Sequence, residues 1–237
     1  MKFGIIGAMD LETELLIKEM GMPTDTILAG MTFYSGKLKG VETVVVTSGV
    51  GKVNAAACTQ ILITHFGVDH LINTGVSGAI HDDLNVGDLV ISLDCMEHDM
   101  DATAFGYEYG IIPRLDNSVF VADSNLVNLA YTASQSEVTA HKTMKGRIVS
   151  GDQFVSSQEK KRFLQEQFKA DTTEMEGAAI AHVAYLNKVP FVIIRAMSDK
   201  ADGSAHVSFD TFAVEAANNS SKIVLNMLAH MDKSLNI

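Results

Sequence analysis

The chain has 237 residues and a mass of 25.5 kDa, a length that suits one large α/β domain or two small ones. Hydrophobic residues make up 47% and charged residues 20%, which argues against a disordered, fibrous or collagen-like protein. The 29 acidic residues outnumber the 18 lysines and arginines, and the net charge of −11 would repel nucleic acid and anionic membrane surfaces.

Short β-rich runs alternate with longer helical patterns along the chain. The runs predicted as strands cover 2–7, 32–38, 42–48, 69–74, 88–94, 145–150 and 190–196. The patterns predicted as helices cover 11–20, 52–66, 124–134, 158–168, 177–187 and 209–231. This alternation predicts an α/β fold with a mostly parallel sheet covered by helices. No repeat or linker divides the sequence, so we expect a single domain over 1–237.

The cysteines and the N-terminus indicate a cytoplasmic protein. Cys58 and Cys95 lack the spacing of a metal site, so we expect buried, reduced packing residues with neither a disulfide framework nor structural zinc. The apolar run over 1–7 is too short for a signal peptide, and no stretch approaches the ~18 apolar residues of a membrane-spanning helix. We therefore expect no membrane partner.

Small, polar or acidic residues follow several of the predicted strands. These segments are 7–10, 48–51, 74–78, 150–152 and 198–202. Glycine and serine are common in any single tight turn, but the carboxyl ends of parallel strands share one sheet edge, where glycines let a ligand approach the backbone. Five such segments, three of them carrying acids, predict a small-molecule site at that edge.

Three acidic residues follow the first predicted strand. Asp10 and Glu14 are interpreted as residues of a helix N-terminus that interact with the helix dipole. Glu12 has a second interpretation, because a carboxylate that turns back into the crevice would repel a pyrophosphate and could activate a water molecule. The dinucleotide-binding pattern G-x-G-x-x-G is absent from 4–9.

Two further acidic sites stand at predicted strand ends. Glu174 and Glu176 precede a helix of small residues, where a glutamate can cap the helix or the pair can hold two neighbouring sugar hydroxyls. Asp199 follows an apolar strand and is either a turn residue or, in an apolar pocket that raises its pKa, a proton donor.

Two other segments have alternative interpretations. His98, Asp99 and Asp101 stand too close together to converge easily on one ion, so we expect no metal site there. The aromatic residues and glycines over 105–110 predict a lid or a subunit contact.

Seven segments, in the same order, resemble the bacterial 5′-methylthioadenosine/S-adenosylhomocysteine nucleosidases. They are Gly4–Met9 with Glu12, Ser48–Val53, Asn73–Gly75, Thr103–Gly110, Ile148–Asp152, Glu174–Glu176 and Arg195–Asp199, within a likeness that runs from Met1 to Phe209. The resemblance implies a three-layer α/β/α sandwich with a central mixed, mostly parallel sheet, as in nucleoside phosphorylases. It also implies a homodimer that hydrolyses the adenine–ribose bond without metal or cofactor, in methionine salvage.

The resemblance assigns three catalytic roles. Glu12 resembles the base that activates water, Glu176 the carboxylate that holds the ribose hydroxyls, and Asp199 the acid that protonates adenine at N7. These roles suit the chemistry, because breaking an N-glycosidic bond places positive charge on the ribose and negative charge on the departing base.

Further residues are implied to contact the substrate. Phe154 resembles the residue that stacks on adenine, Val155 the one that binds its edge through the backbone, and Ser198 the one that orients Asp199. The resemblance implies an apolar wall around the ribose and the alkylthio group from Met9, Val50, Met175 and Phe209, with Phe105 and Pro113 contributed by the partner subunit. The other implied substrate contacts are Ser77, Gly78, Arg195 and Ala201.

Two positions depart from the pattern of that family. Val76 and Ser77 stand where a small hydroxyl or alanine pair is usual, so a side-chain contact to the attacking water is lost or moved to Ser77, with reduced turnover. Gly177 replaces a larger residue and is expected to loosen the helix start beside Glu176.

Two other functions compete with the nucleosidase interpretation. A purine nucleoside phosphorylase has the same general fold, but Glu12 would oppose phosphate as the nucleophile. A non-catalytic adenosine-binding module is the other, because a fold and a pocket do not establish turnover. The sequence does not rank methylthioadenosine, S-adenosylhomocysteine, 5′-deoxyadenosine and aminodeoxyfutalosine as substrates.

Overall fold

The computed structural model describes residues 1–235, apart from the side chains of 206, 207 and 232–235. The strands are β1 (Lys2–Gly7), β2 (Thr24–Leu28), β3 (Met31–Leu38), β4 (Val41–Thr47), β5 (His70–Ala79), β6 (Leu89–Glu97), β7 (Phe120–Val121), β8 (Thr143–Ser150), β9 (Thr172–Glu174) and β10 (Phe191–Asp199). The α-helices are α1 (Asp10–Glu19), α2 (Lys52–Thr64), α3 (Ser124–Glu137), α4 (Gln158–Phe168), α5 (Gly177–Asn187) and α6 (Ala205–Leu235), and one 3₁₀ turn, η1, covers Thr103–Phe105.

One mixed sheet runs through the described residues in the order β10-β6-β8-β9-β5-β1-β4-β3-β2, with β7 beside β6. Parallel pairing joins β4, β1, β5 and β10, whereas β2, β3 and β7 pair antiparallel at the margins. Because β10 also pairs with β6, the strands β5, β10, β6, β8 and β9 form a closed ring. The predicted mixed α/β sheet is therefore confirmed.

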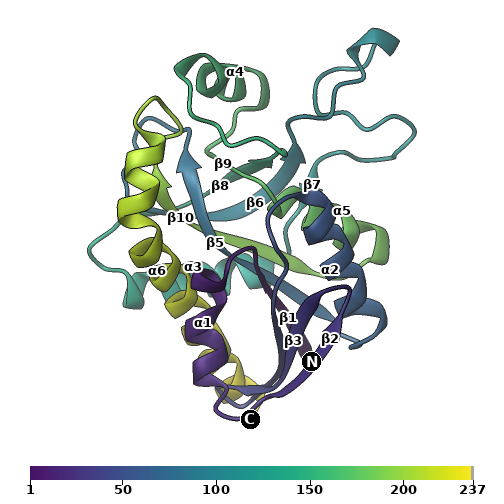
Figure 1. The fold of residues 1–237 in the computed structure, drawn as a ribbon, viewed down its shortest axis with the longest axis vertical. Helices are drawn as coiled ribbons and strands as arrows, with labels where there is room; N and C mark the ends of the chain where they lie inside the picture. The colour runs from purple at the N-terminus through teal and green to yellow at the C-terminus, as the bar shows by residue number, and fades with distance from the viewer. Residues whose placement is uncertain (236–237) are drawn as a thin grey trace.

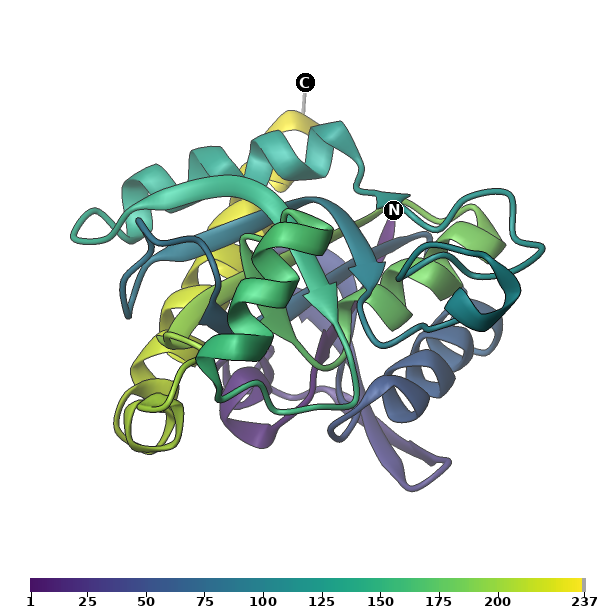
Figure 2. The same cartoon turned by 90° about the horizontal axis from the view of Figure 1, so that it is seen from above.

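Helices cover both faces of the sheet. Figure 1 shows α1, α3 and α6 on one side and α2 and α5 on the other, which gives three layers, and Figure 2 shows the same layers from above. The helix α6 packs on β5 and β10 and also contacts α1 and α3, while α2 packs on α5. The strand β10 is buried along its whole length, as a central strand covered on both faces must be. No helix within residues 1–235 is long and apolar enough to cross a membrane.

The structure differs from the predicted elements at several boundaries. The strand β5 continues through Gly75 and Gly78 to Ala79, and β10 continues to Asp199, where the sequence predicted turns. Pairing with β10 and β9 holds this glycine-rich end of β5 extended. The short strands β2, β7 and β9 were not predicted, and α6 begins at Ala205 rather than near 209.

Candidate active site

A cavity of about 370 Å³ opens at the carboxyl ends of β1, β5 and β10. Its lining residues are Ala8, Met9, Glu12, Val50, Val76, Ser77, Gly78, Gln153, Phe154, Val155, Thr173, Glu174, Met175, Glu176, Ser198, Asp199, Phe209 and Asp210. A larger hollow of about 810 Å³ lies at the opposite end of β10, beside Phe191 and Tyr185. The predicted sheet edge therefore carries the cavity with the convergent acids.

Glu12 is held by the backbone at the start of α1. Its Oε2 accepts hydrogen bonds from the N–H groups of Ala8 at 2.6 Å and Met9 at 3.0 Å, and its Oε1 accepts one from Val76 at 2.9 Å. Burial raises the pKa of this carboxyl, against the opposing effects of the Arg195 charge and the three N–H donors. Glu12 thus faces the cavity as a buried carboxyl, while Asp10 is exposed in the first turn of α1.

Glu176 lines the same cavity and stands directly before α5. Its Oε1 accepts a hydrogen bond of 2.8 Å from the N–H of Gly51, and its Oε2 lies 3.5 Å from Arg195 Nη2. Burial, with the nearby charge of Glu174, raises the pKa of Glu176 to about 8. A carboxyl with a raised pKa loses its proton more readily when a positive charge develops beside it, because the charge stabilises the carboxylate.

Arg195 lies beneath the acids rather than on the cavity wall. Its guanidinium pairs with Glu174 and lies 3.8 Å from Glu12 Oε1, and the side chain is 1% exposed. A buried arginine among three carboxylates compensates their mutual repulsion. The resemblance implied a substrate contact for Arg195, but this residue is not among those that line the cavity, because Glu174, Glu12 and Glu176 surround its guanidinium.

Glu174 serves two functions at the start of α5. Its carboxylate accepts hydrogen bonds from the N–H groups of Glu176 at 3.0 Å and Gly177 at 2.8 Å, and it contacts the Ser150 hydroxyl. The capping interpretation therefore holds for Glu174, and Glu176 is free to face the cavity. A side chain at Gly177 would approach Ile193 to 3.1 Å, so the helix start is closely packed.

Asp199 ends β10 and lines the same cavity. Its Oδ2 accepts a hydrogen bond of 2.8 Å from Ser198 Oγ, and its Oδ1 accepts one of 2.8 Å from the N–H of Ala201. Burial raises the pKa of Asp199 despite both hydrogen bonds. Ser198 holds the acid in place as predicted from the resemblance, while Ala201 contacts Asp199 through its backbone and does not line the cavity.

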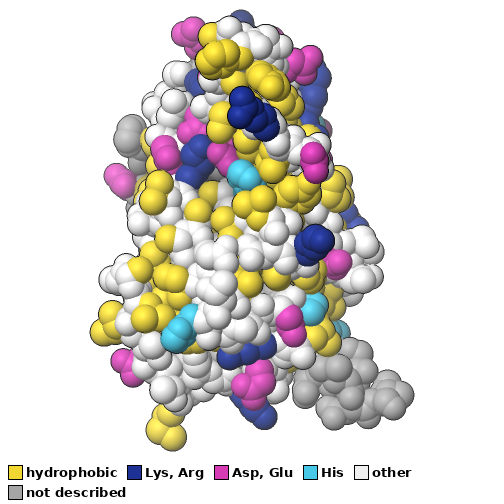
Figure 3. Space-filling model, turned by 90° about the vertical axis from the view of Figure 1, so that its right-hand side faces the viewer, with side chains coloured by type: hydrophobic (Ala, Val, Ile, Leu, Met, Phe, Trp, Pro, Cys, Tyr) yellow, Lys and Arg dark blue, Asp and Glu magenta, His cyan; other side chains and the backbone are white. Residues whose placement is uncertain are grey.

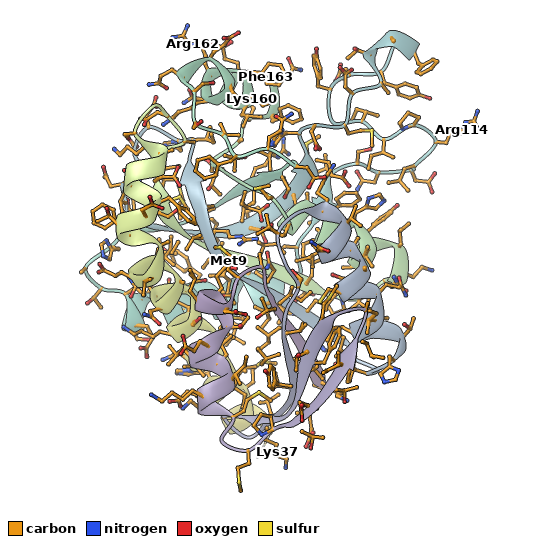
Figure 4. The ribbon with its side chains drawn as sticks, viewed as in Figure 1. Met9, Lys37, Arg114, Lys160, Arg162 and Phe163 are labelled. Atoms are coloured by element: carbon orange, nitrogen blue, oxygen red, sulfur yellow. The ribbon has the colours of Figure 1, made fainter. Side chains whose placement is uncertain are left out.

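The remaining wall is apolar. Figure 4 shows Met9 near the centre of the molecule, where β1 passes into α1. The rings of Phe154 and Phe209 meet edge to face with centroids 6.0 Å apart. Val155 is buried, whereas Val50 and Phe154 are partly open to solvent. This wall suits a flat aromatic base and a thioether.

Two predicted residues lie outside the cavity of this chain. Phe105, in η1, is 84% exposed, and Pro113 lies in the same projecting segment. Figure 4 shows the neighbouring Arg114 at the tip of that segment, away from Met9. These two residues reach a cavity only if it belongs to another subunit, as the resemblance implied.

Five lining residues were not predicted, namely Ala8, Val76, Gln153, Thr173 and Asp210. Each adjoins a predicted residue in sequence, which is the one signal that could have found them. The Val76 N–H binds Glu12, while the Ser77 hydroxyl accepts a hydrogen bond of 2.7 Å from Thr172 Oγ1. The Ser77 hydroxyl is therefore hydrogen-bonded to β9.

Gly75 sits where the acids and the arginine come closest to the backbone. A Cβ atom at this position would overlap Arg195 Nη1 and Glu12 Oε1. Glycine at this point of β5 therefore lets the charged groups pack against the strand.

No group of three or more histidine, cysteine, aspartate or glutamate side chains in the described part of the chain could hold a metal ion. In the segment that resembled a metal cluster, Asp99 instead pairs with Lys52 at 2.6 Å. Cys58 and Cys95 are buried free thiols, as predicted.

Comparison with known proteins defines the class of this fold and site. The family model of the phosphorylase superfamily matches residues 2–229. A 5′-methylthioadenosine/S-adenosylhomocysteine nucleosidase of Bacillus pumilus is 43% identical over 96% of this chain and 98% of that protein. The chain thus belongs to the phosphorylase superfamily and, within it, to the 5′-methylthioadenosine/S-adenosylhomocysteine nucleosidases.

Solved structures agree with this assignment. The Neisseria meningitidis nucleosidase in complex with methylthio-immucillin-A superposes with a TM-score of 0.93 at 40% identity, over 97% of this chain and 99% of that chain. The futalosine hydrolase of Helicobacter pylori superposes with a TM-score of 0.92 at 35% identity, over 97% of each chain. Relatives of one fold therefore carry names for different nucleoside substrates.

Proposed function

We propose that this protein is a hydrolase that cleaves the N-glycosidic bond of 5′-methylthioadenosine and S-adenosylhomocysteine. The products are adenine and the 5′-thioribose compound. The observation that carries the proposal is the convergence of three buried acids, Glu12, Glu176 and Asp199, on one cavity with an apolar wall.

Asp199 supplies the proton for the leaving group. As the bond between C1′ and N9 breaks, its electron pair moves onto adenine, and Asp199 protonates N7 so that neutral adenine departs. The raised pKa of Asp199 supports this role, since the group keeps its proton to higher pH than an ordinary aspartate. Phe154 and Val155 would hold the base beside it.

Glu176 and Glu12 act on the ribose side. Glu176 accepts hydrogen bonds from the ribose hydroxyls, and its negative charge becomes more favourable as the ribose gains oxocarbenium character, which stabilises the transition state more than the ground state. Glu12 accepts a proton from the attacking water as the water oxygen bonds to C1′. Both carboxyls are buried, so these charges act with little screening.

Water is favoured over phosphate as the nucleophile. Phosphate requires cationic or amide-rich contacts, and no lysine or arginine is among the described residues of the cavity wall. The Arg195 guanidinium already faces Glu12, Glu174 and Glu176. The carboxylate of Glu12 would also repel phosphate directly.

The proposal includes a homodimer of single-domain subunits in the cytoplasm, acting in methionine salvage. Support for a dimer comes from exposed hydrophobic side chains on one side of the molecule, among them Phe105 at 84% and Val53 at 78% exposure. Figure 3 shows hydrophobic side chains spread over that side, with charged side chains set among them. Buried free thiols at Cys58 and Cys95 fit a reducing compartment.

Adenine release in phosphate-free buffer tests the reaction. We expect the wild-type protein to release adenine from methylthioadenosine without phosphate, and Glu12→Gln to lower kcat by ~10²-fold or more with adenine binding retained. Adenine that appears only after phosphate is added would indicate a phosphorylase. Equal activity in the variant and the wild type would contradict the role of Glu12.

A further inference from the structure

We infer that Lys52 is a positioning residue for the nucleosidase reaction: it joins three loops beside the cavity and thereby holds the Gly51 N–H against Glu176. This inference rests on the proposed function, because Glu176 matters here as the ribose-binding carboxylate. Lys52 itself is not among the residues that line the cavity. It acts on Glu176 indirectly, through the backbone at the start of α2, where the Gly51 N–H donates to that carboxylate.

The Lys52 ammonium group bridges two carboxylates from another part of the chain. Its Nζ lies 2.9 Å from Glu97 Oε2 and 2.6 Å from Asp99 Oδ1, at and just beyond the end of β6. All three side chains are less than one-fifth exposed. Burial opposes ionisation of Glu97 and Asp99, but hydrogen bonds from Lys52 and other neighbours lower the pKa of both carboxyls below the usual range. The contact is therefore a sheltered, fully charged pair of salt bridges.

A third loop completes a ring of interactions. Asp99 Oδ2 accepts a hydrogen bond of 2.9 Å from the N–H of Asp152, and Asp152 Oδ1 accepts one of 2.8 Å from the N–H of Lys52. Lys52, Asp99 and Asp152 thus bind one another in a closed circuit. Asp152 also begins the segment that carries Phe154 and Val155 to the cavity wall.

The ring fixes the direction of the Gly51 amide. Gly51 has a φ of +97°, in the region that favours glycine, and its N–H donates to Glu176 Oε1 at 2.8 Å. A Cβ atom at Gly51 would lie 3.0 Å from Asp152 Oδ1, so the ring packs closely beside this backbone. Val50, one residue earlier, lies on the cavity wall and moves with the same backbone.

Loss of the Lys52 side chain should therefore change the pKa of Glu176. The charged groups that face Glu176 are Glu174 from β9, Arg195 from β10 and Glu12 from α1, and α2 presents the uncharged Gly51 N–H. This N–H stabilises the ionised carboxyl. When it moves away, the pKa of Glu176 rises further, and a higher pH is needed to form the carboxylate that stabilises the ribose charge.

The Lys52→Met variant tests the inference, with Lys39→Met as the matched control. Lys39 also forms a 2.6 Å salt bridge, to Glu19, but at the turn between β3 and β4. We expect Lys52→Met to lower kcat/KM for methylthioadenosine by ~10- to 100-fold, as misplacement of a substrate-positioning group does. Its acidic limb in the pH profile of kcat/KM should move to higher pH, and amide exchange over 49–52 should accelerate. Lys39→Met should match the wild type in all three measurements.

Asp99→Asn provides a second, milder variant. It removes one charge from the ring and keeps an oxygen that can accept the Asp152 N–H, so we expect a smaller change in the same three measurements. Unchanged exchange over 49–52 and an unmoved acidic limb in either folded variant would overturn the inference. If the wild type releases no adenine, the proposed function fails, whereas the exchange measurement still reports whether Lys52 holds Gly51.

Discussion

At the scale of single residues, the three acids differ in the donors that surround them. Glu12 accepts three backbone N–H groups, Glu176 accepts one and faces a guanidinium, and Asp199 accepts a hydroxyl and one N–H. The three amide donors of Glu12 oppose the rise in its pKa that burial causes and thereby support its charged form, which suits a base. At Asp199 the effect of burial outweighs the two hydrogen bonds and favours a carboxyl that retains its proton, which suits an acid.

The pH dependence of turnover should report the proton on Asp199. Because burial raises the pKa of Asp199, kcat should fall as the pH rises through that raised value and the proton is lost. Asp199→Asn cannot donate this proton, so kcat should fall by ~10²-fold or more and the alkaline limb should disappear. The measurement is kcat for adenine release as a function of pH. Wild-type turnover by the variant at neutral pH would exclude Asp199 as the acid.

At the scale of elements, the site depends on how strands end and helices begin. The strand β10 reaches Asp199 and carries Arg195 beneath the cavity, while Glu174 at the end of β9 caps α5 and leaves Glu176 facing inward. The helix α6 contributes from the outside, since Ser221 Oγ binds the Glu12 carbonyl at 3.0 Å. Small shifts in these junctions would therefore move the acids.

The Glu174→Gln substitution tests the cap of α5. An amide keeps the shape but weakens the hydrogen bonds to Gly177 N–H and leaves the buried Arg195 with one carboxylate fewer. We expect the free energy of unfolding to fall by ~1–3 kcal/mol, as for a buried hydrogen-bonded charge. Urea denaturation measures it, with Glu14→Gln on the exposed face of α1 as the control. Equal stability of the two variants would show that Glu174 is not needed as a cap.

The alternation of apolar runs was enough to predict the main helices, the parallel strands and the sheet edge that carries the cavity. It could not predict β9, because three residues with no period of their own form a strand only when β5 and β8 are already in place. The same limit applies to Arg195. Its position in an apolar strand was visible, but the three carboxylates that bury it come from distant segments.

At the scale of the whole molecule, the cavity is open on the side of Val50 and Phe154. The segment that carries Phe105 and Pro113 projects away from the sheet, as Figure 1 shows for the loop between β6 and β7. In the proposed homodimer each projecting segment completes the cavity of the other subunit. A single chain would then hold the acids without a closed thioether pocket.

The Phe105→Ala variant tests this arrangement. In an isolated chain the loss of a side chain that is 84% exposed should change little. In the proposed dimer it removes an apolar contact to the substrate, so KM for methylthioadenosine should rise about tenfold. Sedimentation gives the subunit number, and Met22→Ala, at 99% exposure, is the control. A fully active monomer would contradict the dimer.

Gly75 has a consequence for how freely this sequence can vary. Even the smallest side chain would occupy the space that the ends of Arg195 and Glu12 fill, so alanine at this position requires both charged groups to shift. In a saturation library selected for adenine release, this codon should return glycine far more often than any other residue, although Gly75 is not among the residues that line the cavity. The ion cluster beside the strand thus restricts which residues this position can accept.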